Sequence, residues 1–151
     1  MTAKYYWEDF PVGDKRLCGP VTVSAEEIID FALKFDPQDF HIDAELAKHS
    51  RFGSLIASGW HVCAMAMRLI CDGFMLETAG LGSPGVDKVR WKQPVRPGDS
   101  LSLQALVLGA RRSESRPEVG LVHWHWDITN QLGQSIAEIE STGMVRCRST
   151  A

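Results

Sequence analysis

The middle of the chain contains a segment that is apolar on nearly all sides. From Ser58 it reads SGWHVCAMAMRLICDGFML, interrupted by His61, Arg68 and Asp72. A helix of this kind is enclosed by the rest of a protein, because a surface helix keeps one polar face. The segment is also too short and too interrupted to cross a membrane, which requires about 20 apolar residues. The remainder of the chain therefore has to supply elements that wrap around this helix.

The second half of the chain has the pattern of consecutive strands. After the turn-rich residues 80–85, four runs are separated by the turn sequences RPGD and NQLG and by an arginine-rich link. In the third run, Val122, Trp124 and Trp126 alternate with mostly polar side chains, which indicates a sheet with one apolar face. The four expected strands cover residues 86–93, 100–110, 120–130 and 135–148.

A capping box marks the start of a helix before the enclosed segment. The Ser24 hydroxyl can accept a hydrogen bond from the amide three residues on, while Glu27 reaches back to the Ser24 amide. Pro37 disfavours helical geometry at the residue before it, which places the end of this helix at Phe35 or Asp36. The sequence therefore predicts a helix that stops just before a proline.

Two smaller elements complete the order of the chain. A strand is expected over residues 15–23, and Asp43 is placed to cap a short helix over residues 44–48. The order is then strand, helix, short helix, enclosed helix and a run of antiparallel strands. We predict an α+β protein with one domain over residues 1–151, in which a curved antiparallel sheet wraps around a central helix, the hot-dog fold.

Charge and composition argue against several classes of partner. The formal net charge is -3 and no block of Lys and Arg occurs, so nucleic acid is not an expected partner. The N-terminus has no apolar core followed by a small-residue cleavage site, so we expect a cytoplasmic protein without a membrane partner. The four cysteines form no CxxC pair and are expected to be buried thiols. The five histidines lack metal-ligand spacing, so no metal is expected.

The stretch FDPQDFHID, residues 35–43, contains a candidate acid/base pair. On one continuous helix, Asp36 and His41 would lie about 140° apart around the axis. Pro37 prevents that continuation, so the two side chains can converge on one small volume. A carboxylate and an imidazole in one pocket have the separable protonation behaviour that acid/base chemistry at neutral pH uses. The alternative is a helix-end carboxylate and a loop histidine that satisfy the local backbone.

The start of the enclosed helix is a candidate oxyanion site. The first amides of a helix lack intrahelical acceptors and lie at the positive end of its dipole, and Gly59 has no side chain to block a substrate carbonyl. Together with the acid/base pair, this site suits proton transfer beside a carbonyl, with gain or loss of water. His61 is expected to be a core residue, and His123 and His125 to lie on a solvated sheet face.

Three sequences occur in order along the chain: DPQDFH (residues 36–41), FGSLIASGWH (residues 52–61) and WKQPVRPGD (residues 91–99). Together they resemble the MaoC-like dehydratases, the (R)-specific enoyl-CoA hydratase group of the hot-dog superfamily. The similarity runs from about Tyr5 to Arg148.

The resemblance implies a homodimer, or a higher oligomer, whose sheets join side by side and which binds an acyl thioester of coenzyme A or acyl carrier protein in a tunnel. It implies no separate cofactor, because coenzyme A is part of the substrate. In the family, an Asp and a His activate water for addition to a trans-2-enoyl thioester or run the dehydration in reverse. Carried over to this chain, Asp36 and His41 are the catalytic pair and the Gly59 amide binds the thioester oxygen. Four further residues are expected to contact the substrate: Gln38, Ser58, Trp60 and Arg90.

The chain departs from the family pattern at two places. Family members often have D-x-N-P-x-H, whereas here Gln38 stands for the Asn and Asp39 for the Pro.

Two other functions are compatible with the same fold, since fold alone does not decide function. One is a thioesterase that uses the same oxyanion geometry for hydrolysis. The other is a non-catalytic subunit that binds acyl thioesters.

Overall fold

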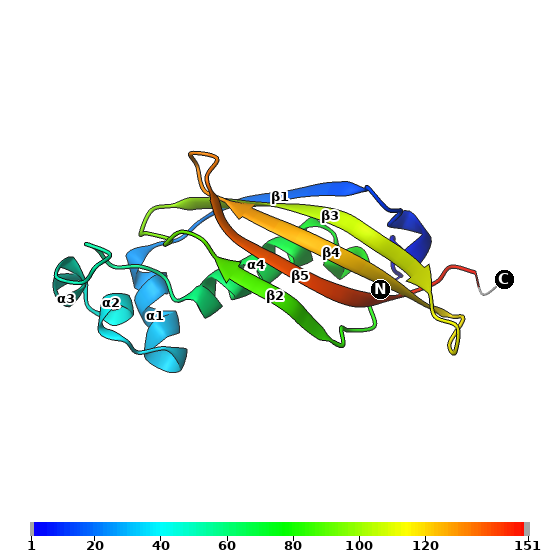
Figure 1. Ribbon diagram of the computed structural model, residues 1–151, viewed down its shortest axis with the longest axis horizontal. Helices are drawn as coiled ribbons and strands as arrows, with labels where there is room; N and C mark the ends of the chain where they lie inside the picture. Colours follow the sequence, from blue (N-terminus) through cyan, green and yellow to red (C-terminus); the bar gives the residue numbers. More distant parts are fainter. Residues whose placement is uncertain (1, 150–151) are drawn as a thin grey trace.

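Five antiparallel strands form one sheet in the computed structural model, which describes residues 2–149 (Figure 1). Their order across the sheet is β1-β3-β4-β5-β2, so β1 and β2 are the two edges. Met1, Thr150 and Ala151 of the predicted domain lie outside the described residues. The strands are β1 (Lys15–Thr22), β2 (Gly85–Trp91), β3 (Ser100–Arg112), β4 (Val119–Thr129) and β5 (Ser135–Arg146).

One long helix, α4 (Gly59–Gly73), lies along a face of the sheet and packs against β1 and β3. Three shorter helices gather beyond one end of the sheet, at the left of Figure 1. They are α1 (Ala25–Phe35), α2 (Asp39–Ile42) and α3 (Ala44–Lys48). Among residues 2–149, no helix is long and apolar enough to cross a membrane. The α+β class, with an antiparallel sheet around one long helix, is confirmed.

The core lies between α4 and the apolar face of the sheet. Val62, Ala66 and Ile70 of α4 are buried on one side of it, and the inner face of β4 carries Trp124 and Trp126. Burial alternates along β4, as the period of two predicts. The prediction of one apolar and one mostly polar sheet face is therefore confirmed.

Local capping chemistry sets the helix boundaries. Ser24 and Glu27 form the predicted reciprocal capping box at the start of α1, with both hydrogen bonds at 3.1 Å. Helix α1 ends at Phe35, before Pro37, and Asp43 caps α3 by accepting from two amides. Every predicted strand boundary agrees with the observed one within two residues. The four-residue α2 was not predicted, nor were the 3-10 turns Trp7–Asp9 and Met75–Glu77.

The enclosure of α4 is complete on one side only. Trp60 and Met67, on its outer side, are 60% and 40% exposed. A sheet contacts a helix with one face, so the outer side of α4 is not covered by the sheet of its own chain. The apolar run of residues 58–76 is therefore enclosed less fully than expected, and it ends as a helix at Gly73.

Candidate active site

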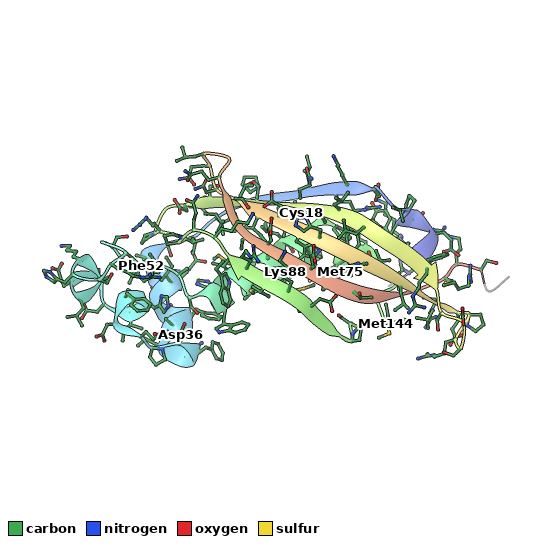
Figure 2. All side chains as sticks on the ribbon, viewed as in Figure 1. Cys18, Asp36, Phe52, Met75, Lys88 and Met144 are labelled. Carbon is green, nitrogen blue, oxygen red and sulfur yellow. The ribbon has the colours of Figure 1, made fainter. Side chains whose placement is uncertain are left out.

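A cavity of about 510 Å³ lies where the helical end of the molecule meets the first turn of α4. Figure 2 shows Asp36 and Phe52, two of its lining residues, at this end. The other lining residues come from Gln38 and α2, from the segment before α4 and the first turn of α4, and from residues 91–95, which begin at the last residue of β2. Four separate parts of the chain therefore build its walls.

Asp36 lies at the end of α1 and its two carboxylate oxygens have different partners. Ser58 donates its hydroxyl hydrogen to Oδ2 at 2.7 Å, and the Gln38 side-chain amide donates to Oδ1 at 2.7 Å. Burial opposes ionisation and is the largest single influence on the pKa of Asp36. The two hydrogen bonds and the attraction of His41 together outweigh it, and the pKa lies below its ordinary value. Asp36 is therefore a carboxylate at neutral pH.

His41 is buried on α2, and both ring nitrogens face specific oxygens. Nδ1 lies 2.7 Å from the Ile56 carbonyl oxygen, and Nε2 lies 3.3 Å from Oδ2 of Asp36. Since a carbonyl oxygen only accepts, Nδ1 carries the proton of the neutral ring. Nε2 of the neutral ring is then unprotonated and can take a proton beside the Asp36 carboxylate.

Gly59 is the first residue of α4, and Ser58 is its N-cap. The Gly59 amide has no hydrogen-bond acceptor among residues 2–149, as expected for the first turn of a helix. Trp91 donates its indole N–H to the Gly59 carbonyl at 3.0 Å. A Cβ at position 59 would lie 2.5 Å from Cε2 of Trp91, so this close approach requires glycine.

Most of the predicted site residues meet at this cavity. Asp36, His41, Gly59, Gln38 and Trp60 all line it. Two predicted substrate contacts are placed differently. Ser58 is fully buried behind the wall, where it holds Asp36, and Arg90 lies on β2, outside the cavity lining.

Several lining residues were not predicted from the sequence. Trp91 covers Gly59 and meets Trp60 edge to face, with ring centroids 5.2 Å apart. Phe52 contacts Phe40, another lining residue, with ring centroids 5.2 Å apart. Both residues stand at the start of sequences that carried the family resemblance, FGSLIASGWH and WKQPVRPGD. Their place in these two sequences is the feature by which the sequence could have indicated them as site residues.

The other histidines lie away from the cavity. His61 is 8% exposed and stacks on Phe31 with ring centroids 4.6 Å apart, but its Nδ1 has no hydrogen-bond partner in the described chain. Burial lowers the pKa of His61, partly opposed by Glu27. His123 and His125 lie on the outer sheet face, and no three His, Cys, Asp or Glu side chains within residues 2–149 gather as metal ligands would.

The cysteines are free thiols of two kinds. Cys18 and Cys147 are buried, as predicted, whereas Cys63 and Cys71 on α4 are half-buried. Burial raises the pKa of the Cys18, Cys63 and Cys147 thiols, so the neutral form is favoured.

Comparisons with known proteins identify the family and the fold of this chain. The family model described as "MaoC like domain" matches residues 9–124. An uncharacterized protein, YdeM of Bacillus subtilis (strain 168), is 29% identical over 140 residues, covering 92% of this chain and 97% of that protein. Protein MaoC of Klebsiella aerogenes is 28% identical over 100 residues, which span 66% of this chain and 29% of that longer protein.

Solved structures with the same fold include enzymes. A MaoC-like dehydratase from Rhodospirillum rubrum is 38% identical, with a TM-score of 0.88, covering 96% of this chain and 99% of that one. The R-hydratase PhaJ1 from Pseudomonas aeruginosa has a TM-score of 0.76 at 21% identity, covering 95% of this chain and 86% of that one. At that identity the likeness to PhaJ1 shows the fold alone.

Proposed function

The chain belongs to the MaoC-like domain family of hot-dog proteins, and from this membership we propose that it is a hydratase or dehydratase of acyl thioesters. The proposed reaction adds water across the double bond of a 2-enoyl thioester, or removes it from the (R)-3-hydroxyacyl thioester. The carrier is coenzyme A or acyl carrier protein, and the proposal requires no separate cofactor. The observation that carries it is the contact of His41 Nε2 with Asp36 Oδ2 at 3.3 Å, in a cavity that also contains Gly59.

In the proposed hydration, Asp36 and His41 bind one water molecule between them. His41 Nε2 takes a proton from this water, because its Nδ1 proton is already donated to the Ile56 carbonyl. The water oxygen forms a bond to C3 of the acyl chain, and the electron pair of the C2=C3 bond moves toward the thioester. The Asp36 carboxylate stabilises the imidazolium that forms beside it.

The negative charge of the intermediate collects on the thioester oxygen. The Gly59 amide is a free donor at the N-terminus of α4, where the helix dipole also favours negative charge. His41 then returns the proton to C2, which completes the addition of one water molecule and restores the pair. Addition of both groups by one pair of residues accounts for a single stereochemical outcome.

A homodimer is part of the proposal. Strand β2 is an edge of the sheet, and exposed apolar side chains lie along it and along the neighbouring side of α4. They include Val86, Trp60 and Met67, which are 59%, 60% and 40% exposed. A second copy placed against this edge would pair the unpaired backbone groups of β2 and cover these side chains.

The test is a panel of trans-2-enoyl-CoA esters, from crotonyl-CoA to longer chains, followed by loss of the enone absorbance and by mass spectrometry. Hydration appears as the gain of one water molecule. Release of free coenzyme A would identify a thioesterase instead, and binding without any turnover would identify a non-catalytic acyl-thioester protein. Either result contradicts the proposed reaction.

A further inference from the structure

The loop between α3 and α4 forms one wall of the active-site cavity. It runs back from the helical end of the molecule to the start of α4 (Figure 1), and it contributes Arg51, Phe52, Ile56 and Ala57 to the lining. We call residues 51–57 the wall segment. Because this segment contains no helix or strand, its position depends on individual bonds to other parts of the chain.

The two ends of the wall segment are fixed by hydrogen bonds of backbone amides. At the first end, the bonds go to Ser50 and are local to one turn. At the other end, the Ile56 amide donates to the Phe40 carbonyl at 3.1 Å. The next amide, that of Ala57, donates to the Val95 carbonyl at 2.9 Å. The part between these ends is held in a different way.

Arg96 bonds to the wall segment between its two ends. Its Nη1 donates to the Phe52 carbonyl at 2.8 Å and to the Ser54 hydroxyl. Within residues 2–149, no other hydrogen bond links residues 52–55 to a distant part of the chain. Arg96 forms no ion pair with a carboxylate of the described chain, so its partners there are neutral oxygens. The guanidinium therefore holds this segment and does not neutralise an acid.

Arg96 is held in turn by the turn RPGD, residues 96–99. The Arg96 amide donates to Oδ2 of Asp99 at 2.9 Å, and the Asp99 amide donates to the Arg96 carbonyl at 3.0 Å. Oδ1 of Asp99 accepts from the side chain of Gln131, at 3.0 Å, in the connection between β4 and β5. Arg96 therefore connects the wall segment to the sheet.

The wall segment reaches His41 at two points. The Ile56 carbonyl accepts a hydrogen bond from Nδ1 of His41 at 2.7 Å. The Phe52 ring contacts the Phe40 ring, which meets the His41 ring edge to face with centroids 4.5 Å apart. A shift of residues 52–55 is therefore transmitted to both contacts. Misplacing a catalytic group by about 1 Å can cost about 100-fold in rate.

We propose that Arg96 is a positioning residue for His41. By holding residues 52–54, it keeps the Ile56 carbonyl bonded to Nδ1, so that Nδ1 carries the proton and Nε2 faces Asp36 as the base. Arg96 lies outside the cavity lining and contacts neither member of the acid/base pair. This inference rests on the proposed function, because that function makes His41 Nε2 the base.

The first test reads the tautomer of His41 and needs no turnover. Two-dimensional ¹H–¹⁵N spectra of the imidazole rings are recorded at a pH of about 9, where histidine is neutral, and the His41 signals are assigned by their loss in His41→Gln. Wild-type His41 should be a single Nδ1–H tautomer. Arg96→Gln should give a mixture of the Nδ1–H and Nε2–H tautomers. Arg96→Lys, which keeps a donor without the planar fork, should be intermediate.

The second test measures the rate of hydration with the best enoyl-CoA substrate. Arg96→Gln should lower kcat by about 10- to 100-fold, with a smaller change in KM, because the base acts in the chemical step. Arg96→Lys should recover part of this loss. A merely structural role would lower the melting temperature without changing kcat per folded molecule or the His41 tautomer.

Arg112→Gln is the matched control. Nη1 of Arg112 also donates to a backbone carbonyl, that of Pro117, at 2.8 Å, and Arg112 lies outside the cavity lining. This variant should leave the His41 tautomer and kcat unchanged. Ser54→Ala removes one of the two acceptors of Arg96 and should give a smaller change in the same direction. It keeps the test valid if Arg96→Gln does not fold.

The two proposals can fail separately. A single Nδ1–H tautomer in folded Arg96→Gln, or in Ser54→Ala if Arg96→Gln does not fold, overturns the inference whatever the rates are and leaves the proposed function standing. A mixture of tautomers supports the positioning of His41 by Arg96. If the wild-type protein then hydrates no enoyl-CoA, the proposed function alone is overturned.

Discussion

Ser58 and Asp36 are joined by a hydrogen bond of 2.7 Å that connects the start of α4 to the end of α1. The same hydroxyl accepts a hydrogen bond from the Trp60 amide at 3.3 Å, so it is fixed by one hydrogen bond that it donates and one that it accepts. Because Gly59 is the next residue after Ser58, the carboxylate and the free amide keep a fixed relationship. The two halves of the proposed active site are therefore held together by one buried serine.

Loss of either member of the acid/base pair should abolish most of the hydration activity. We expect Asp36→Asn and His41→Gln to lower kcat by about 100-fold or more, the usual contribution of a positioned proton-transfer group. The assay is the loss of enone absorbance with the best substrate of the panel. Asp39→Asn is the control, since Asp39 is exposed and lies outside the cavity lining. Equal rates in all three variants would contradict the assigned roles.

Ser58→Ala should destabilise the protein in a pH-dependent way. The pKa of Asp36 is lowered in the folded chain from its ordinary value of 3.8. Below about pH 3.8 the unfolded chain therefore binds more protons than the folded chain, and stability falls as the pH is lowered through this range. Removing the Ser58 hydroxyl reduces that lowering. We expect a loss of about 2 kcal/mol at neutral pH that shrinks in acid, measured by urea unfolding.

The matched background for this test is Asp36→Asn. An amide does not titrate, so in that background Ser58→Ala should lower the free energy of unfolding by the same amount at every pH. A loss that stays constant with pH in the wild-type background as well would show that the hydroxyl does not act through the carboxylate.

Gly59→Ala should be poorly tolerated unless Trp91 is also changed. A Cβ at position 59 would lie 2.5 Å from the Trp91 ring, so either the ring or the first turn of α4 has to move. Overpacking of this kind costs about 1–3 kcal/mol. In a Trp91→Ala background this clash with the ring is absent, so the same substitution should cost less. Thermal unfolding of the four proteins gives the coupling energy, and strict additivity would rule out the clash.

His61 should make stability fall as the solution is acidified. Burial lowers the pKa of His61 in the folded chain from its ordinary value of 6.5, so below that pH the unfolded chain binds more protons and is favoured. His61→Phe keeps an aromatic ring against Phe31 but cannot titrate. We expect the variant to lose less stability than the wild type between neutral pH and pH values below 6.5. Parallel pH dependences of the two proteins would contradict this.

Elements with a local cause were predictable from the sequence. The capping box of Ser24 and Glu27, the stop before Pro37 and the cap at Asp43 each act within a few residues, and each appears as expected. The alternation of apolar and mostly polar residues along β4 indicates directly that one face of this strand is buried. The four residues of α2 are too few to show helical periodicity, so this helix could not be predicted from the spacing of apolar residues.

Contacts between segments that are distant in the sequence were harder to predict. Asp36, His41 and Gly59 were expected to converge, and the cavity contains all three. That Ser58 turns toward Asp36 instead of the cavity depends on the angle between α1 and α4, which no short sequence pattern encodes. The cover that Trp91 forms over Gly59 depends on β2 pairing with β5 at the edge of the sheet. Such pairing is decided by the whole fold.

The walls of the active-site cavity are tied together across long stretches of chain. The Ile56 amide donates to the Phe40 carbonyl, the Ala57 amide to the Val95 carbonyl, and the Trp91 indole to the Gly59 carbonyl. These bonds join segments that lie 16 to 38 residues apart in the sequence, so a molecule in which residues 40–95 are only partly folded has no assembled pocket. Catalytic rate is then a sensitive reporter of complete folding, and during refolding it should recover only after β2 has docked.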